Sequence, residues 1–259
     1  MLKDVFEVEI ADGVARCTMK GPRMNALGND LLEPMVDGFG SVFSSDDVRV
    51  IVLRGGEGNF CSGGDVGDMG EKMDPLELNR NMHLANWIGL ELNEGPRPVI
   101  TEVDGWAVGG GMGLAMSADL TYATERAKFM MSFVRISIVP DLGSSYLLPQ
   151  RVGLLKAKEL VFTGRTVGAE EALELGIVNY VMPHEEISDE VMKFAKSLAG
   201  RSPRFLATAK RNLNMAQNAG LRTMLELEES IQPTMVLEPQ HHRDIEEFMR
   251  NKAAKDKKS

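Results

Sequence analysis

The chain has 259 residues, of which 43% are hydrophobic and 26% charged, with a formal net charge of −9. This composition is typical of a globular protein with a sizeable core, and it disfavours nucleic acid as a partner because phosphate binding requires a concentrated positive surface. We find neither a signal peptide nor an apolar run that could span a membrane, so we expect a cytoplasmic protein without a membrane partner. Cys17 and Cys61 lie far apart, which fits a reducing compartment and gives no indication of a metal site.

The first half of the chain predicts strands that alternate with glycine-rich loops and helices. Residues 5–10 and 14–19 alternate between apolar and polar side chains around a turn at residues 11–13, which predicts a β-hairpin. Pro22 and Asn25 then indicate a loop. The later elements predicted by periodicity are a helix over 29–43, a strand over 48–53, a helix over 75–92, a strand over 98–103, a helix from 109–111 to 118 and a strand over 120–123. Strands separated by helices indicate an α/β fold with parallel crossovers.

The second half of the chain is predicted to be mainly helical. Helical spacing begins at Ala169, and glycine and proline become rare after Pro183. We therefore expect a core domain over residues 1–200 and a helical C-terminal region over residues 201–259.

Two glycine-rich turns are the first candidates for a functional site. Residues 60–65 (FCSGGD) and 109–111 (GGG) each follow a predicted strand, and the second turn opens a helix. Glycine permits close approach of backbone to a ligand, and free N–H groups at a helix start carry partial positive charge. Two such turns side by side would direct two donors at one oxygen. Neither turn matches the dinucleotide or P-loop pattern, and either one alone also fits ordinary loop glycine.

Four segments, taken in chain order, resemble motifs of the crotonase (enoyl-CoA hydratase/isomerase) superfamily. Residues 22–27 (PRMNAL) are similar to its P-x-x-N-A-L start, and residues 60–65 are similar to its F-C/A-A/S-G-x-D segment. Residues 103–111 (VDGWAVGGG) are similar to V-N-G-x-A-x-G-G-G, and residues 163–178 resemble the segment that begins T-G-x and ends G-L-V. Together the motifs cover roughly residues 5 to 215.

The resemblance implies a fold, a substrate class and a set of site residues. It implies an α/β crotonase-like spiral of ββα units with a helical C-terminal trimerisation region, assembled as a homotrimer or hexamer. It implies an acyl-CoA substrate, with no cofactor beyond the CoA moiety. The backbone N–H groups of Gly64 and Gly110 would form an oxyanion hole for the thioester oxygen. The expected substrate- and CoA-binding residues are Ala26, Ser62, Gly63, Asp65, Val66, Gly109 and Gly111.

The acid–base residues narrow the reaction within this superfamily. Its hydratases use two glutamates, and the corresponding positions hold Gly113 and Phe133, which cannot transfer protons. Asp141 follows Pro140 as in the ring-type enoyl-CoA isomerases of the 2-(1,2-epoxy-1,2-dihydrophenyl)acetyl-CoA isomerase kind, where this Asp is the acid–base. A double-bond shift needs one group that removes a proton and returns it to another carbon. We expect apolar neighbours to desolvate Asp141 and raise its pKa; they are Phe133, Ile136, Val139 and Leu142.

Several alternatives remain open from the sequence. Asp141 in a Pro-Asp-x-Gly segment also fits a β-turn or a helix N-cap. The superfamily's dehalogenases also have Gly and Asp at the positions of Gly113 and Asp141, and His83 and Trp87 share one predicted helix face. Hydrolysis, decarboxylation, residual hydration and a non-catalytic acyl-CoA-binding protein are further possibilities. We expect the pocket walls to include the loop over residues 67–74, with these methionines as candidates: Met69, Met73, Met112, Met130 and Met131.

Overall fold

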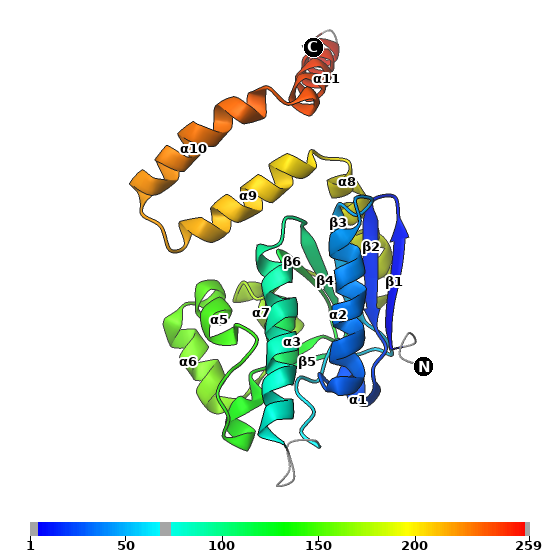
Figure 1. Ribbon diagram of the computed structural model, residues 1–259, viewed down its shortest axis with the longest axis vertical. Helices are drawn as coiled ribbons and strands as arrows, with labels where there is room; N and C mark the ends of the chain where they lie inside the picture. Colours follow the sequence, from blue (N-terminus) through cyan, green and yellow to red (C-terminus); the bar gives the residue numbers. More distant parts are fainter. Residues whose placement is uncertain (1–4, 68–73, 257–259) are drawn as a thin grey trace. The chain divides into compact units, whose positions relative to one another are not determined.

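The computed structural model describes residues 5–67 and 74–256 (Figure 1). Its contacts form two compact units, Met1–Gly200 and Arg201–Ser259. Residues 68–73 lie outside the described part, and with them most of the loop that was expected to line the pocket, including Met69 and Met73.

The first unit contains a six-stranded sheet in the order β1-β2-β3-β4-β6-β9. Its strands are β1 (Phe6–Ala11), β2 (Val14–Met19), β3 (Val50–Gly55), β4 (Val99–Val103), β6 (Leu120–Thr124) and β9 (Tyr180–Met182). The β1–β2 hairpin is antiparallel, and its turn places Asp12 at φ 53° and Gly13 at φ 78°, the left-handed backbone that tight hairpins favour. Every later neighbour pairs in parallel, which confirms the α/β crossover arrangement.

The inner strands β3 and β4 are buried on both faces, as expected for parallel strands, whereas the edge strand β1 is partly exposed. Side chains of β3 alternate: Val50 and Val52 join the cluster formed with helix α8 (His184–Ala199), whereas Ile51 and Leu53 join the larger core on the other side. Helices α2 (Asn29–Ser44) and α3 (Pro75–Glu94) pack against each other and contribute to that larger core (Figure 1). Both helices begin and end within two residues of the sequence prediction, because their apolar faces repeat at helical spacing.

A second sheet of three short strands was not predicted from the sequence. It has the order β5 (Trp106–Val108), β7 (Lys128–Met130) and β8 (Thr166–Gly168). Three residues are too few to display an alternating pattern. The strand β5 leads directly into helix α4 (Gly110–Met116), whose residues are all buried, so this small sheet holds the second glycine turn in place.

The remaining elements of the first unit follow in chain order: α1 (Pro22–Asn25), the 3₁₀ helix η2 (Ser132–Ile136), α5 (Ser144–Val152), α6 (Leu154–Thr163) and α7 (Ala169–Glu174). The second unit consists of α9 (Pro203–Ala216), α10 (Leu221–Val236) and α11 (Pro239–Asp256), with large exposed apolar side chains that include Leu213, Leu221 and Leu237. Within the described residues, none of the helices combines the length and the apolar character that crossing a membrane requires.

Candidate active site

The chain approaches the site through a left-handed turn that the sequence analysis treated as a loop. Arg23, Met24 and Asn25 have φ values of 53°, 58° and 58°. This conformation costs on the order of 1–2 kcal/mol for each residue other than glycine. Buried hydrogen bonds offset the cost: the Asn25 side-chain amide donates to the carbonyls of Asn59 and Phe60, both at 3.0 Å. The turn is therefore tied to the first glycine loop.

Ser62 also connects the left-handed turn to the first glycine loop. Its backbone N–H donates to the Met24 carbonyl at 2.9 Å, and its hydroxyl donates to the Arg23 carbonyl at 2.8 Å. Immediately downstream, the N–H of Leu27 donates to the Gly63 carbonyl at 2.8 Å, and Leu27 and Gly64 form a parallel bridge. The predicted binding residue Ser62 thus fixes the backbone beside Gly64, and Ala26 is buried in the same connection.

The two glycine loops lie against each other, as the sequence analysis expected. Cys61 and Ala107 form a parallel bridge, and the N–H of Val108 donates to the Cys61 carbonyl at 2.9 Å. A Cβ on Gly63 would stand 2.5 Å from the Val108 carbonyl oxygen, and one on Gly111 would stand 2.3 Å from the Cys61 carbonyl oxygen. Both positions exclude any side chain, so these two glycines permit the close approach of the loops.

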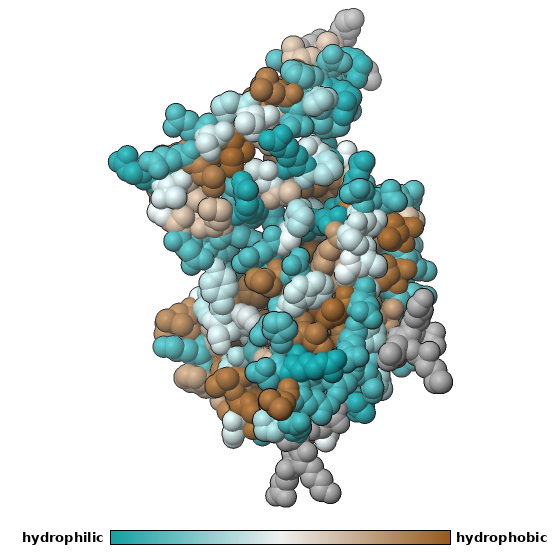
Figure 2. Space-filling view, in the orientation of Figure 1, coloured by the Kyte–Doolittle hydropathy of each residue, from teal (hydrophilic) through white to brown (hydrophobic). Residues whose placement is uncertain are grey.

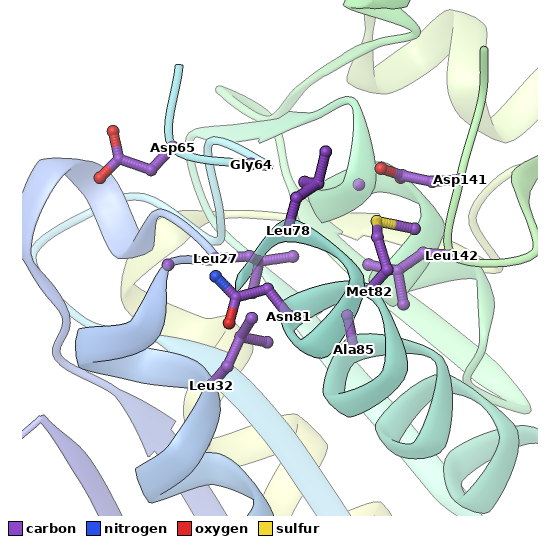
Figure 3. A pocket seen from close by; sticks show the side chains of 12 residues that line it. Leu27, Leu32, Gly64, Asp65, Leu78, Asn81, Met82, Ala85, Asp141 and Leu142 are labelled. Carbon is purple, nitrogen blue, oxygen red and sulfur yellow. The ribbon is translucent and has the colours of Figure 1, made fainter. Parts of the chain in front are cut away.

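Gly64 and Gly110 line one small cavity of about 50 Å³. Gly110 is the first residue of α4, where backbone N–H groups have no partner within the helix. Among the backbone hydrogen bonds of the described residues, neither the Gly64 nor the Gly110 N–H acts as a donor. The full lining is Leu27, Gly28, Leu32, Gly64, Asp65, Leu78, Asn81, Met82, Ala85, Gly110, Asp141 and Leu142 (Figure 3).

Asp141 lies in the same cavity, and its carboxylate is directed into it (Figure 3). Its Oδ1 atom stands 3.1 Å from the position that a Cβ on Gly110 would occupy. This oxygen is buried and has no hydrogen-bond partner among the described residues. The Asp141 carboxylate therefore lies beside the backbone of Gly110 in the same cavity.

The backbone around Asp141 explains this orientation. The Ser144 N–H donates to the Asp141 carbonyl at 2.8 Å, and the intervening Leu142 and Gly143 have φ values of 47° and 70°. This is a tight turn, as one of the alternative interpretations expected. The N-cap interpretation is wrong, because Gly143 is the N-cap of α5 and no side chain caps that helix. The turn is made by the main chain, so the carboxylate takes no part in capping the helix.

Burial raises the pKa of Asp141 from 3.8 to about 6, and a hydrogen bond from its own backbone N–H opposes this only in part. Asp141 is desolvated as predicted, but two of the four residues that were expected to desolvate it do not do so. Ile136 and Val139 are 42% and 80% exposed, whereas Leu142 is buried beside the carboxylate. The rest of the apolar lining comes from Leu27, from Leu32 of helix α2 and from helix α3.

This raised pKa predicts a stability cost for ionised Asp141. Between pH 3.8 and 6 the folded state binds more protons here than the unfolded state, so stability falls as pH rises through this window. Above it, ionised Asp141 costs on the order of 1–3 kcal/mol. Asp141→Asn is expected to be more stable than the wild type at pH 7.5, with the difference vanishing near pH 3. Urea unfolding at both pH values measures this, and an equal or lower stability of the variant at pH 7.5 would contradict it.

The two positions where hydratases carry glutamates are unsuited to that role here. A Cβ on Gly113 would stand 2.7 Å from the Ser144 hydroxyl and 3.1 Å from the Leu142 carbonyl oxygen. Phe133 is buried, and its ring lies against Gly109. The turn that carries Asp141 thus occupies the space that a side chain at position 113 would need.

The predicted binding residues Asp65 and Val66 do not direct their side chains into the cavity. Asp65 forms an ion pair with Arg23 and accepts a hydrogen bond from the Gly67 N–H at 3.0 Å. Although Asp65 borders the cavity, its carboxylate points away from it (Figure 3). Val66 is 57% exposed and does not line the cavity. Gly109, with φ 53°, donates its N–H to the Met130 carbonyl at 2.8 Å.

Helix α3 supplies pocket residues that the sequence analysis missed. Leu78, Asn81, Met82 and Ala85 line the cavity from one face of this helix. The Asn81 Oδ1 atom is buried without a hydrogen-bond partner among the described residues, so it adds a polar group to an otherwise apolar wall. The helical spacing of residues 75–92 was the available signal, but periodicity does not distinguish a core face from a pocket face.

Other candidates from the sequence lie elsewhere. His83 is exposed, and Trp87 packs edge-on against Phe43 at a ring distance of 5.8 Å. Neither residue lines the cavity, which removes the support for a dehalogenase-type pair. Among the residues that the structure describes, the methionine in the cavity wall is Met82, whereas the expected candidates Met112, Met130 and Met131 are buried in the core.

Known proteins share both the sequence and the fold. The chain is 32% identical to a short-chain-enoyl-CoA hydratase of Clostridium acetobutylicum, over 83% of each chain. It is 30% identical to a 1,2-epoxyphenylacetyl-CoA isomerase of Escherichia coli, over 86% of this chain and 87% of that one. An enoyl-CoA hydratase/isomerase structure from Cupriavidus metallidurans matches with a TM-score of 0.88 at 31% identity, covering 96% of this chain and 94% of that one.

These similarities confirm the predicted crotonase-type α/β fold and the family resemblance. The sequence profile of the family described as enoyl-CoA hydratase/isomerase matches residues 9–257, which is nearly the whole chain. The relatives include proteins named as hydratases and as isomerases, so the reaction has to be argued from the site. The chain belongs to the enoyl-CoA hydratase/isomerase family and is an acyl-CoA enzyme with the crotonase fold.

Proposed function

We propose that the protein is an enoyl-CoA isomerase that converts 3-enoyl-CoA into 2-enoyl-CoA, with Asp141 as its single proton shuttle. The observation that carries the proposal is the carboxylate of Asp141, directed into the cavity lined by Gly64 and Gly110 (Figure 3). Its pKa of about 6 suits a group that both takes and returns a proton near neutral pH.

In the proposed reaction, ionised Asp141 removes a proton from C2 of the bound 3-enoyl thioester. The electrons delocalise over C2 to C4 and the thioester oxygen, where the Gly64 and Gly110 N–H groups stabilise the negative charge. One such donor contributes about 3 kcal/mol. Protonated Asp141 then delivers the proton to C4, which leaves the double bond between C2 and C3. Both proton transfers occur on the face where Asp141 lies, so no second acid–base residue is required.

Hydration is the competing reaction within the family, and the site disfavours it. Water addition in the family's pattern uses two glutamates. Neither Gly113 nor Phe133 carries a carboxylate, and the close contacts at Gly113 leave no space for a side chain there. In either case the proposed substrate is an acyl-CoA. We also propose that the protein assembles as a trimer through residues 201–259, which the exposed apolar side chains of that unit support.

Product identification tests the proposal. We expect 3-hexenoyl-CoA to give 2-hexenoyl-CoA of unchanged mass, because the reaction only relocates a double bond. Incubation of 2-hexenoyl-CoA is expected to yield no 3-hydroxyacyl-CoA above the background rate. Liquid chromatography with mass detection separates these species. Formation of the hydroxyacyl product, heavier by one water molecule, would assign the protein to the hydratases.

A further inference from the structure

A second cavity lies next to the proposed active site on the far side of Leu142. It has a volume of about 290 Å³ and is lined by residues of α3, by Ser117 just after α4, and by the start of α5; Asn86, Gly89, Leu90, Leu142 and Leu147 are among its lining residues. The cavity that contains Asp141 is much smaller, about 50 Å³. Leu142 is the one residue that lines both cavities, within the part of the chain that the structure describes.

Leu142 is held tightly between two helices. One methyl carbon, Cδ1, stands 3.3 Å from where a Cβ on Gly110 would be, and the other, Cδ2, stands 3.3 Å from the corresponding position on Gly89. The side chain therefore bridges the space between α4 and α3, and it fits because both facing residues are glycine. Leu142 is only 5% exposed, although its φ of 47° is unfavourable for leucine. The fold keeps a bulky side chain at a position where glycine would be the relaxed choice.

The position of Leu142 matters because Asp141 precedes it directly. A substrate whose C2 and C4 face Asp141 extends its remaining carbons along the apolar wall of α3. Leu78, Met82 and Ala85 line the first cavity, and Gly89 and Leu90, further along the same helix, line the second. The molecular face that carries α3 shows apolar residues among polar ones (Figure 2). Leu90 of α3 is 54% exposed. The apolar residues of α3 thus run along both cavities, and Leu142 lies between the two cavities.

We propose that Leu142 is a specificity-determining residue that closes the acyl pocket at its far end, restricts the enzyme to short acyl chains, and separates them from a cavity that would accept longer ones. The inference rests on the proposed function, because it takes the cavity at Asp141 as the acyl pocket. It assigns the substrate class as short-chain aliphatic acyl-CoA.

Binding of saturated acyl-CoAs tests this without any turnover. Each buried methylene strengthens binding about fourfold, as long as the pocket continues. For the wild type we expect affinity to stop rising between butanoyl-CoA and decanoyl-CoA, where the chain meets Leu142. In Leu142→Ala and Leu142→Gly the affinity is expected to keep rising with chain length. The affinity for decanoyl-CoA should therefore increase at least tenfold relative to that for butanoyl-CoA. The glycine variant also relaxes the positive φ, which protects folding.

Two further variants locate the effect. Leu147→Ala removes the same number of atoms from the second cavity while leaving Leu142 in place, and it is expected to bind all chain lengths as the wild type does. Adding Asn86→Trp to Leu142→Ala fills the second cavity from the exposed face of α3 and is expected to abolish the gain for decanoyl-CoA.

The outcomes separate the two proposals. A wild type whose affinity rises steadily up to decanoyl-CoA, or a Leu142→Ala variant that shifts every chain length equally, would overturn the role of Leu142. A wild type with the expected length limit but without isomerase activity would overturn the proposed reaction and leave the role of Leu142 intact. Isothermal titration calorimetry provides the affinities, and the isomerisation assay with 3-hexenoyl-CoA provides the activity.

Discussion

Replacement of Asp141 by asparagine is expected to lower kcat for 3-enoyl-CoA isomerisation by a factor of about 10²–10⁴, the usual contribution of a positioned acid–base group. The amide has nearly the same shape as the carboxylate but cannot accept and return a proton. Because the side chain keeps its shape at this half-buried position, the substitution preserves the packing around Leu142. Binding of butanoyl-CoA is therefore expected to change little, and it serves as the control for folding. Retention of more than a tenth of the wild-type kcat would rule out Asp141 as the shuttle.

The pH dependence of the wild-type enzyme follows from the same residue. Asp141 must be ionised to remove the C2 proton, and burial raises its pKa to about 6. We expect kcat/KM to rise tenfold per pH unit below pH 6 and to reach a plateau above it. A plateau that extends to pH 4.5 would indicate a base with an ordinary carboxylate pKa in solution, and would exclude a desolvated Asp141.

The second large effect is expected from the N–H group of Gly110. Gly110→Pro removes this donor at the first position of α4, where proline is tolerated in helices. Gly110→Ala keeps the N–H group and introduces the same Cβ, which would stand 3.1 Å from the Asp141 Oδ1 atom. The two variants thus share the added Cβ, whereas only proline replaces the N–H hydrogen with a ring carbon. Loss of one oxyanion donor typically lowers kcat by 10²–10³.

We accordingly expect Gly110→Pro to have a kcat at least 100-fold below that of Gly110→Ala, with thermal unfolding used to verify that both variants are folded. Equal kcat values for the two variants would mean that this N–H group does not stabilise the transition state. A loss that appears only in KM would place the N–H group in substrate binding rather than in catalysis.

Long, periodic elements and glycine motifs could be predicted from the sequence. The β-branched run of residues 48–53 predicts a buried strand, and β3 (Val50–Gly55), which is buried on both faces, confirms this. The two glycine turns could be paired because each follows a parallel strand, and the Cys61–Ala107 bridge brings them together. Asp141 could be singled out because its place after Pro140 resembles that of the acid–base Asp in the ring-type isomerases.

The remaining features depend on tertiary contacts that no local pattern records. The left-handed turn of Arg23, Met24 and Asn25 exists because the Asn25 amide reaches carbonyls more than 30 residues away. The exposure of Val139 and the burial of Leu142 could not be separated by hydropathy, since both are apolar and only three positions apart. The positive φ of Leu142, which directs its side chain between two helices, has no sequence signal because leucine disfavours that conformation.

The most direct test of the central claim follows a single proton. Carboxylate and oxyanion hole together are proposed to move one proton from C2 to C4 on one face of the substrate. With 3-hexenoyl-CoA deuterated at C2, we expect part of the label to appear at C4 of the 2-hexenoyl-CoA product under single-turnover conditions, as measured by mass spectrometry and NMR. A 3-hydroxyhexanoyl-CoA product from the wild type, or the same label transfer in Asp141→Asn, would contradict it.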